Sequence, residues 1–420
     1  MTSEPHSTLA PFRVRSFRFQ WPADLATSWA FEMETLILGW YVLVETASVL
    51  LLTLFASLQY LGTLLAPMFG VVGHRIGNKR LLCAMRAIYA ILATTLMTFA
   101  FLGALTPVHV FVIAALMGMV RPSDLVMRYA LVGESMPSRL LVGATSVSRT
   151  TQDSARMLGA LAGAGLVATL GMGPAYSVIA LLYGASFLLT LRVSGALPHP
   201  PPALDKPAHS QPPSAWHDLR EAAAYVRDKP QLLAAIYIAV LVNLTAFPLV
   251  NGLLPYVAKE VYGTDQTGLG YMVAGFALGA LLGSIALSRY SSSVRAGRMI
   301  IVFCLAWYSM TLLFGHMETR SGGILVLVLA GFAQSLGMVS MSAMLLRNSA
   351  DRLRGRIMGL RMLAIYGVPV GLLVSGPLIG RFGYPATATA YSVIGLSVTL
   401  LIAVRWREHL WNLDAPANLR

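Results

Sequence analysis

Two glutamates lie inside an apolar stretch near the N-terminus. Glu32 and Glu34 are two positions apart, and most of the residues around them are apolar. A carboxylate in apolar surroundings can bind and release a proton as its exposure to water changes. Residues two apart point to nearly opposite sides of a helix. Only one of them can therefore face a central site directly, and the sequence does not say which.

Two later stretches each place an aspartate between two arginines on one helix face. The residues are Arg121, Asp124 and Arg128 in the first stretch and Arg149, Asp153 and Arg156 in the second. Counting outward from a turn near Pro137 predicts ion pairs across the two helices, Asp124 with Arg149 and Arg121 with Asp153. Two interpretations stay open. The candidates Glu32, Glu34, Arg121, Asp124, Asp153 and Arg156 form a network for proton coupling and substrate binding, or the ion pairs only fix helix packing.

Polar and aromatic residues of the second half could line the opposite wall of such a site. They are Asn243, Asn251, Tyr256, Gln334 and Tyr366. Each of them could also simply be a hydrogen-bonded residue inside a helix bundle. Mid-span ionisable residues are nearly absent from this half, which predicts that the charged chemistry lies in the first half.

The composition indicates the environment of these residues. Of 420 residues, 56% are hydrophobic and 12% are charged, whereas soluble domains carry about 25% charged residues. We therefore expect a protein embedded in a lipid bilayer. The net charge of +13 comes largely from arginines between apolar stretches, where they orient helices, so we expect no nucleic-acid partner. The two cysteines and the scattered histidines predict neither a disulfide nor a metal site, and the sequence indicates no cofactor.

The predicted fold is an all-α membrane protein. It has twelve transmembrane helices in two pseudo-symmetric six-helix bundles. About 20 apolar residues cross a bilayer, which places spans at 22–44, 47–72, 81–104, 108–132, 141–169, 174–193, 231–257, 267–289, 298–317, 323–346, 356–380 and 386–405. The basic residues gather in alternate loops, which predicts that both termini are cytoplasmic.

Three regions follow from this count: an N-terminal bundle (1–194), a cytoplasmic linker (195–230) and a C-terminal bundle (231–420). The linker begins with a proline-rich segment, Gly195–Ser214. It ends with an amphipathic stretch, Ala215–Lys229, which we expect to form a short helix. This helix could lie on the membrane surface or pack against a bundle.

The two halves repeat the same small-residue motif. Its members are Gly62, Ala66 and Gly70 in the second span and Gly275, Gly279 and Gly283 in the eighth. Similar spacings occur in the fifth and eleventh spans. Small residues four apart let helix backbones approach closely, so we expect these helices to pair across the boundary between the halves. A duplicated bundle is the architecture of many secondary transporters.

The loop after the second span resembles the signature loop of the major facilitator superfamily. It contains Gly70, Gly73, His74, Arg75, Gly77, Lys79 and Arg80. The resemblance implies that these residues form a cytoplasmic gate, with Glu134 as a partner for Arg75 or Arg80. His74 replaces the usual aspartate, and Ala160 follows Gly159 where the antiporter motif has proline. Both departures weaken the case for strict drug/proton antiport.

Further stretches resemble the drug and siderophore exporter branch, related to the enterobactin exporter. They are Phe17–Phe19, Gly39–Leu43 and Asp351–Met358. The resemblance implies a proton-coupled exporter of drug-like compounds or siderophores that works by alternating access, and not an enzyme. We expect a monomer in a bacterial cytoplasmic (inner) membrane. Two alternatives are an ion-independent facilitator of a metabolite and a transporter-like receptor or scaffold.

Overall fold

The computed structural model is built of helices. It describes residues 10–63, 68–69, 73, 76–193, 215–290, 296–350 and 353–411, and no strand occurs among them. The chain divides into unit 1 (Met1–Tyr41 and Leu58–Ser210) and unit 2 (Val42–Ser57 and Gln211–Arg420). The first long helix therefore belongs mostly to unit 1, while its last turn groups with unit 2. Each unit is described by itself below.

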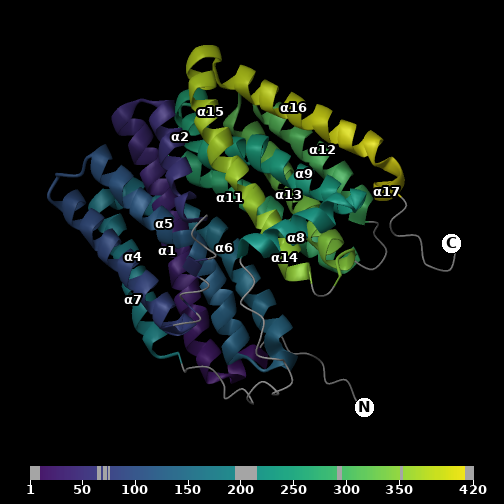
Figure 1. Cartoon of the computed structure of the whole chain (residues 1–420). Coiled ribbons are helices and arrows are strands. Elements are labelled where there is room, and N and C mark those ends of the chain that lie inside the picture. Colours follow the sequence, from purple (N-terminus) through teal and green to yellow (C-terminus); the bar gives the residue numbers. More distant parts are fainter. Residues whose placement is uncertain are drawn as a thin grey trace. The chain divides into compact units, whose positions relative to one another are not determined.

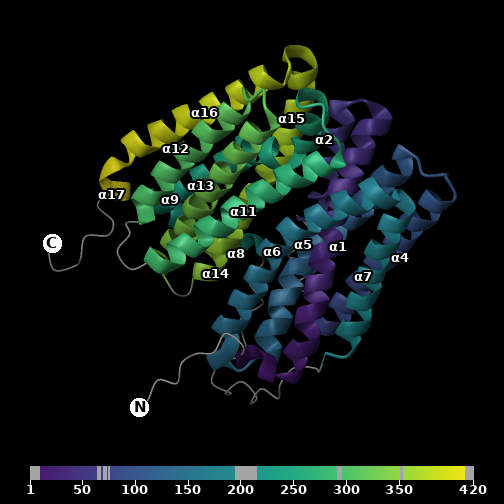
Figure 2. The ribbon, with the colours of Figure 1, turned by 180° about the vertical axis from the view of Figure 1, so that it is seen from behind.

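The described residues of unit 1 form five long helices and two short 3-10 turns. They are η1 (Ala10–Arg13), α1 (Arg15–Thr46, up to Tyr41), η2 (Leu61–Thr63), α4 (Asn78–Phe101), α5 (Pro107–Ser135), α6 (Ser138–Leu170) and α7 (Met172–Leu191). Helices α4 and α7 pack along each other (Figures 1 and 2). Gly171 between α6 and α7 has φ 82°, a conformation that glycine adopts without steric cost.

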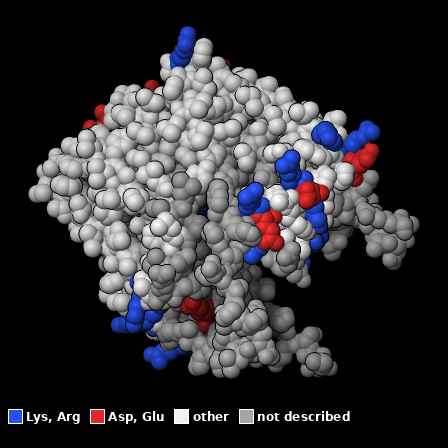
Figure 3. Space-filling model, in the orientation of Figure 1, with Lys and Arg blue, Asp and Glu red and all other residues white. Residues whose placement is uncertain are grey.

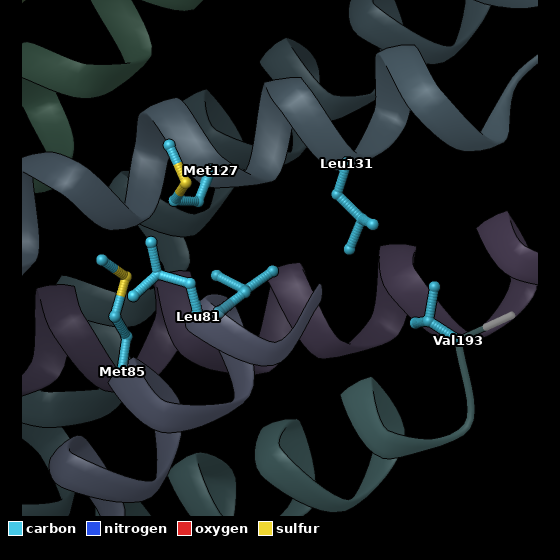
Figure 4. Close-up of a cluster of buried hydrophobic side chains, with 6 residues drawn as sticks. Leu81, Met85, Met127, Leu131 and Val193 are labelled. Atoms are coloured by element: carbon cyan, nitrogen blue, oxygen red, sulfur yellow. The ribbon is translucent and has the colours of Figure 1, made fainter. Parts of the chain in front are cut away.

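One end of unit 1 is filled by a hydrophobic cluster. Leu81 and Met85 of α4 pack against Met127 and Leu131 of α5, and Val193 completes the cluster after α7 (Figure 4). Burying each such side chain stabilises the fold by about 1.5–3 kcal/mol in water. The cluster fixes α4 against α5, the two helices that carry the arginines described below.

Two glycines, which have no side chain, let neighbouring segments lie close to α5 and α1. A Cβ at Gly62 would lie 1.9 Å from the carbonyl oxygen of Met119. A Cβ at Gly163 of α6 would lie 2.9 Å from the Cα of Met33 in α1. Larger residues do not fit at these points, so the glycines set how the segment after α2 and helix α6 lie against the charged helices.

Unit 2 contains the remaining helices. They are α2 (Val49–Leu58, up to Ser57), α8 (Ala215–Arg227), α9 (Pro230–Thr245), η3 (Pro248–Gly252), α10 (Leu254–Tyr256), η4 (Val257–Val261), α11 (Gln266–Tyr290), α12 (Ala296–Phe314), α13 (Arg320–Arg347), α14 (Arg354–Leu363), η6 (Ala364–Tyr366), α15 (Gly367–Phe382), α16 (Tyr384–Arg405) and α17 (Arg407–Trp411). Helix α13 packs against both α11 and α12. Segments η3 and η4 are π-helical. Helix α9 ends at Thr245, shortly before Pro248, which cannot donate a backbone hydrogen bond.

The small-residue motifs mostly serve packing between neighbouring helices, and the predicted pairing across the halves is wrong for three of the four spans. Gly62 packs on α5, Gly163 on α1, and Gly279 on the Val328 carbonyl of α13. The eleventh span is the exception, because Gly376 of α15 lies against Leu50 of α2. Spacing alone identifies a close approach without identifying its partner.

Nine of the described helices are long and apolar enough to cross a membrane, and Val49–Thr63 is a shorter apolar helix. Helices α1 and α6 have 32 and 33 residues, but both carry several charges. The all-helical membrane fold is confirmed, while the count of twelve spans stays a prediction. Figure 3 shows a broad uncharged surface, with most of the visible charged side chains near its lower and right-hand margins.

Helix α8 forms where the sequence predicts a short helix, and it packs on the bundle of unit 2. Ala222 and Val226 are buried, and Glu221 forms an ion pair with Arg356 of α14. The Tyr225 hydroxyl accepts a hydrogen bond from the backbone N–H of Ala350 at 3.2 Å. These contacts favour packing against a bundle over a helix held only by the membrane surface. The proline-rich segment Gly195–Ser214 lies outside the described residues.

Candidate functional site

Four charged side chains form a buried ion-pair cluster inside unit 1. Asp24 of α1 pairs with Arg86 of α4, which is completely buried. The Arg128 Nε of α5 lies 2.5 Å from Asp124 Oδ2 and 3.8 Å from Asp24 Oδ1. Two acids and two arginines thus balance each other. Such a cluster in a membrane helix bundle is costly unless its members are paired.

Neutral groups complete the cluster. Arg86 donates to the Thr190 hydroxyl of α7, and Arg128 donates to the Ser28 hydroxyl at 2.9 Å. The Gln20 amide donates to the Arg128 backbone carbonyl at 3.0 Å. These bonds tie α1, α4, α5 and α7 together around the charges.

Glu34 lies apart from this cluster and has no ion-pair partner among the described residues. It is only 3% exposed, and the Tyr183 hydroxyl of α7 donates a hydrogen bond to its Oε2 at 3.0 Å. Tyr89 of α4 stacks obliquely near Tyr183, with ring centroids 5.4 Å apart. The carboxyl group is therefore enclosed by aromatic rings and a single well-formed hydrogen bond.

Arg121 sits near Glu34 but is held by neutral acceptors. It donates to the Gln59 side-chain carbonyl at 2.8 Å, to the Thr35 hydroxyl at 3.0 Å and to the Phe31 carbonyl at 3.2 Å. Its guanidinium also lies over the Phe31 ring. The predicted pair of Arg121 with Asp153 is therefore wrong, because α1 and the segment after α2 supply its partners.

Glu32 points to the more exposed side of α1. Its Oε1 lies 3.8 Å from the Arg156 Nε of α6, and the two side chains are 19% and 44% exposed. Asp153 pairs with Arg149 one turn away on its own helix at 3.5 Å, as Asp124 does with Arg128. The predicted pair of Asp124 with Arg149 is thus also wrong, because same-helix neighbours four apart are already within reach.

Two small cavities flank Arg128. The Glu34 cavity is lined by Thr27, Phe31, Glu34, Tyr89, Met117, Arg121, Asp124, Arg128 and Tyr183. The Ser148 cavity is lined by Asp24, Ser28, Arg128, Tyr129, Val132, Ser148, Thr151 and Gln152. Each has room for about one water molecule, whereas pockets for drug-sized ligands are about 300–1,000 Å³, so these spaces suit water and not a large substrate.

The candidates of the second half do not line either cavity. Asn243 is buried and donates to the Ala239 carbonyl of its own helix at 2.7 Å. Asn251 is exposed, while Tyr256, Gln334 and Tyr366 are partly buried. A role for them in substrate binding stays a prediction.

The signature loop is described only in part. Gly77 has φ 91°, which explains the glycine there, and a Cβ at Gly73 would lie 2.3 Å from the Asn78 side chain. Glu134 accepts a hydrogen bond from Asn78 at 2.6 Å and forms no ion pair with Arg80 in the described structure. Lys79 donates to the Leu191 carbonyl at 2.9 Å. Gly70, His74 and Arg75 lie outside the described residues.

Sequence reasoning missed four members of the site, Asp24, Arg86, Gln59 and Tyr183. Arg86 interrupts the apolar stretch of the third span, so the rule that singled out Glu32 and Glu34 could have found it. Gln59 and Tyr183 are neutral, and no sequence signal sets them apart from other polar residues of the spans. The described residues contain no group of three or more His, Cys, Asp or Glu side chains that could hold a metal ion.

Comparison with known proteins identifies the family. The family model "Major Facilitator Superfamily" matches residues 25–368 and 236–413. The chain belongs to this superfamily. It is accordingly an integral membrane protein of a transporter family rather than of an enzyme family, as the resemblance of its signature loop predicts.

A curated relative supports the exporter branch. The chain is 25% identical over 279 residues to the enterobactin exporter EntS of Shigella flexneri, which covers 66% of this chain and 62% of the relative. The match thus spans less than two thirds of that protein. What this transporter carries is therefore a matter of proposal.

Solved structures share the fold. The POT family transporter PepTSo matches with a TM-score of 0.72 and 12% identity, covering 96% of this chain and 99% of that one. The nucleoside transporter NupG matches with a TM-score of 0.67 and 15% identity, covering 94% and 98%. At these identities the likeness concerns the fold alone.

Proposed function

We propose that this transporter exports small molecules, drug-like compounds or siderophores, in exchange for protons. The relative named as an enterobactin exporter supports the direction and the cargo class. The proposal places the protein in a bacterial cytoplasmic membrane, as a monomer with both termini in the cytoplasm. Transport would proceed by alternating access, as in other secondary transporters of duplicated architecture.

Glu34 is the residue that carries the proposal. It is a carboxyl group 3% exposed in the middle of α1, and it has a tyrosine hydroxyl as its well-formed hydrogen bond. A charged carboxylate without a direct ion pair is expensive in such a site. A side chain that is neutral with its proton and costly without it can couple proton binding to a change of conformation.

Glu32 and Arg156 take a different part in the proposal. Both are partly exposed in the middle of long helices, where a lipid-facing charge would be unfavourable. We assign this pair to the water-facing side of unit 1, where the cargo passes.

The test is transport by purified protein in liposomes that enclose a pH-sensitive dye. Enterobactin, a lipophilic cation and a neutral drug serve as cargo probes. We expect one class of probe to drive proton movement, and Glu34→Gln to reduce that movement by about a hundredfold or more while the protein elutes as a folded species. Cargo movement without a proton signal in the wild type would instead identify an ion-independent facilitator.

Glu32→Gln is the matched comparison, since it makes the same chemical change two positions away. It removes the pairing with Arg156, so we expect weaker cargo affinity with proton movement retained for each cargo molecule. Full coupling in both single variants and in the double variant would contradict the assignment of coupling to α1.

A further inference from the structure

The two cavities of unit 1 meet at a single side chain. Arg128 lines both of them, and its Nε faces Asp124 at 2.5 Å and Asp24 at 3.8 Å. Asp124 lines the Glu34 cavity, and Asp24 lines the Ser148 cavity. Three acids therefore follow one another through the interior of unit 1, with the guanidinium of Arg128 between the last two.

Unpaired polar atoms extend this series. Asp124 Oδ1 and the Tyr89 hydroxyl are buried and have no hydrogen-bond partner among the protein atoms. Each cavity is large enough for water, and buried polar atoms of this kind are commonly satisfied by ordered water. Tyr129 and Gln152 also line the Ser148 cavity. Both are partly exposed and would connect the cavity to solvent.

We propose that protons move between Glu34 and water through the interior of unit 1, by way of Asp124 and Asp24, and that Arg128 gates this route. This inference rests on the proposed proton coupling. In the first step the O–H bond of Glu34 breaks and an O–H bond forms on Asp124, directly or through water. Arg128 meanwhile pairs with the ionised Asp24. In the second step the O–H bond of Asp124 breaks, an O–H bond forms on Asp24, and Arg128 returns to the ionised Asp124; Asp24 then releases its proton to water in the Ser148 cavity.

The charges around the route explain why a gate is needed. Asp24 pairs with Arg86 of α4, and Asp124 pairs with Arg128 of α5. Arg121 of α5 lines the same cavity as Glu34 without a direct ion pair to it. Tyr183, Tyr176 and Tyr89 are the remaining titratable groups that face Glu34 and Asp124. An arginine in a narrow polar path repels free protons. Arg128 would therefore prevent protons from leaking through unit 1 when no cargo is transported. It could still move its ion pair to whichever of the two aspartates is ionised.

The route is separate from the charged face used by the cargo in the proposed function. Neither Glu32 nor Arg156 lines a cavity of the route. The proton would therefore reach Glu34 without crossing the place where cargo passes. This separation makes the route testable without knowing the cargo.

The test measures passive proton entry into liposomes that contain the purified full chain, with a potassium diffusion potential and no cargo. We expect Arg128→Gln to raise proton entry roughly tenfold over the wild type. Adding Glu34→Gln or Asp124→Asn to Arg128→Gln should return it to the wild-type level, because each removes a carboxyl step of the route. Arg149→Gln is the control, since Arg149 has the same i,i+4 aspartate partner but lies outside both cavities.

A wild-type rate in Arg128→Gln, or a leak that persists after both carboxyl substitutions, would overturn the route. If Arg128→Gln does not fold, Arg128→Lys takes its place, because the single ammonium group of lysine cannot hold two carboxylates as a guanidinium can. We expect Arg128→Lys to raise proton entry too, and Glu34→Gln or Asp124→Asn to abolish that increase. The cargo-driven assay of the proposed function is independent of this result. Coupling could be absent there while the leak is present, or the reverse, so the two failures are distinguishable.

Discussion

The two units solve the problem of a polar interior in different ways. In unit 1 the described buried residues include Asp24, Glu34, Arg86, Asp124 and Arg128. No charged side chain is buried among the described residues of unit 2, where hydroxyls do the equivalent bonding, as between Thr245 and Tyr308 at 2.8 Å. Buried charge is expensive in a membrane and is retained where it has a use. The comparison therefore favours unit 1 as the place of the proposed proton coupling.

Close backbone packing, by contrast, is common to both units, since Gly62 lies against the Met119 carbonyl in unit 1. In unit 2 a Cβ at Gly279 would lie 1.9 Å from the Val328 carbonyl oxygen, and one at Gly371 would lie 2.0 Å from that of Leu244. Helices of unit 2 thus approach each other through bare backbone. Packing of this kind is specific in shape and independent of charge, so the two units share it and differ in their buried charged side chains.

The largest effect is expected from Arg86→Met in unit 1. This change leaves Asp24 buried with only the more distant Arg128 to balance it. Removing one partner of a buried pair typically costs about 3–5 kcal/mol, so the purified protein should unfold at a clearly lower temperature. Arg149→Met, at a side chain 67% exposed, is the matched control and should change the unfolding temperature little.

An intermediate effect is expected from Gly279→Ala in unit 2. The added methyl group would meet backbone atoms of α13, which cannot move aside as a side chain can. Overpacking of this kind costs about 1–3 kcal/mol, measured as thermal unfolding in detergent. Gly165→Ala, where nothing lies within 4 Å of the new Cβ, should be neutral. Equal stability of the two variants would contradict the close approach of α11 and α13.

The smallest effect on stability comes from one substitution made in both units. Tyr308→Phe removes the bond to Thr245 in unit 2, and Tyr183→Phe removes the bond to Glu34 in unit 1. Each should cost about 0.5–1.5 kcal/mol. Transport should fall only in Tyr183→Phe, because only its hydroxyl touches the proposed proton-binding group. Equal transport in both variants would remove the distinction between the units.

Much of the fold could be predicted from the sequence, because apolar length and basic loops are local properties. The rotation of a helix about its axis is not local. The spacing of Glu32 and Glu34 places them on opposite faces of α1. Which face is buried depends on the neighbouring helices: Gly163 of α6 packs on Met33 of α1, Glu34 is buried and Glu32 is partly exposed. No feature of α1 alone carries that information.

The pairing of charges failed for a related reason. Counting residues from the turn between two antiparallel helices places Asp124 level with Arg149 and Asp153 level with Arg121. Each aspartate, however, pairs with an arginine four residues away on its own helix. Gln59 became a partner of Arg121 because Gly62 and Gly118 bring the segment after α2 against α5. Such partners depend on tertiary contacts between backbones that spacing does not report.

The central claim is that the coupling proton binds to Glu34 in unit 1. Infrared difference spectroscopy on the purified transporter in lipid, with pH changed stepwise, records the carboxyl band of a protonated acid directly. The account predicts a band that appears on acidification, is absent in Glu34→Gln, and persists in Glu32→Gln and Asp153→Asn. A band that survives in Glu34→Gln and disappears in Glu32→Gln would contradict it.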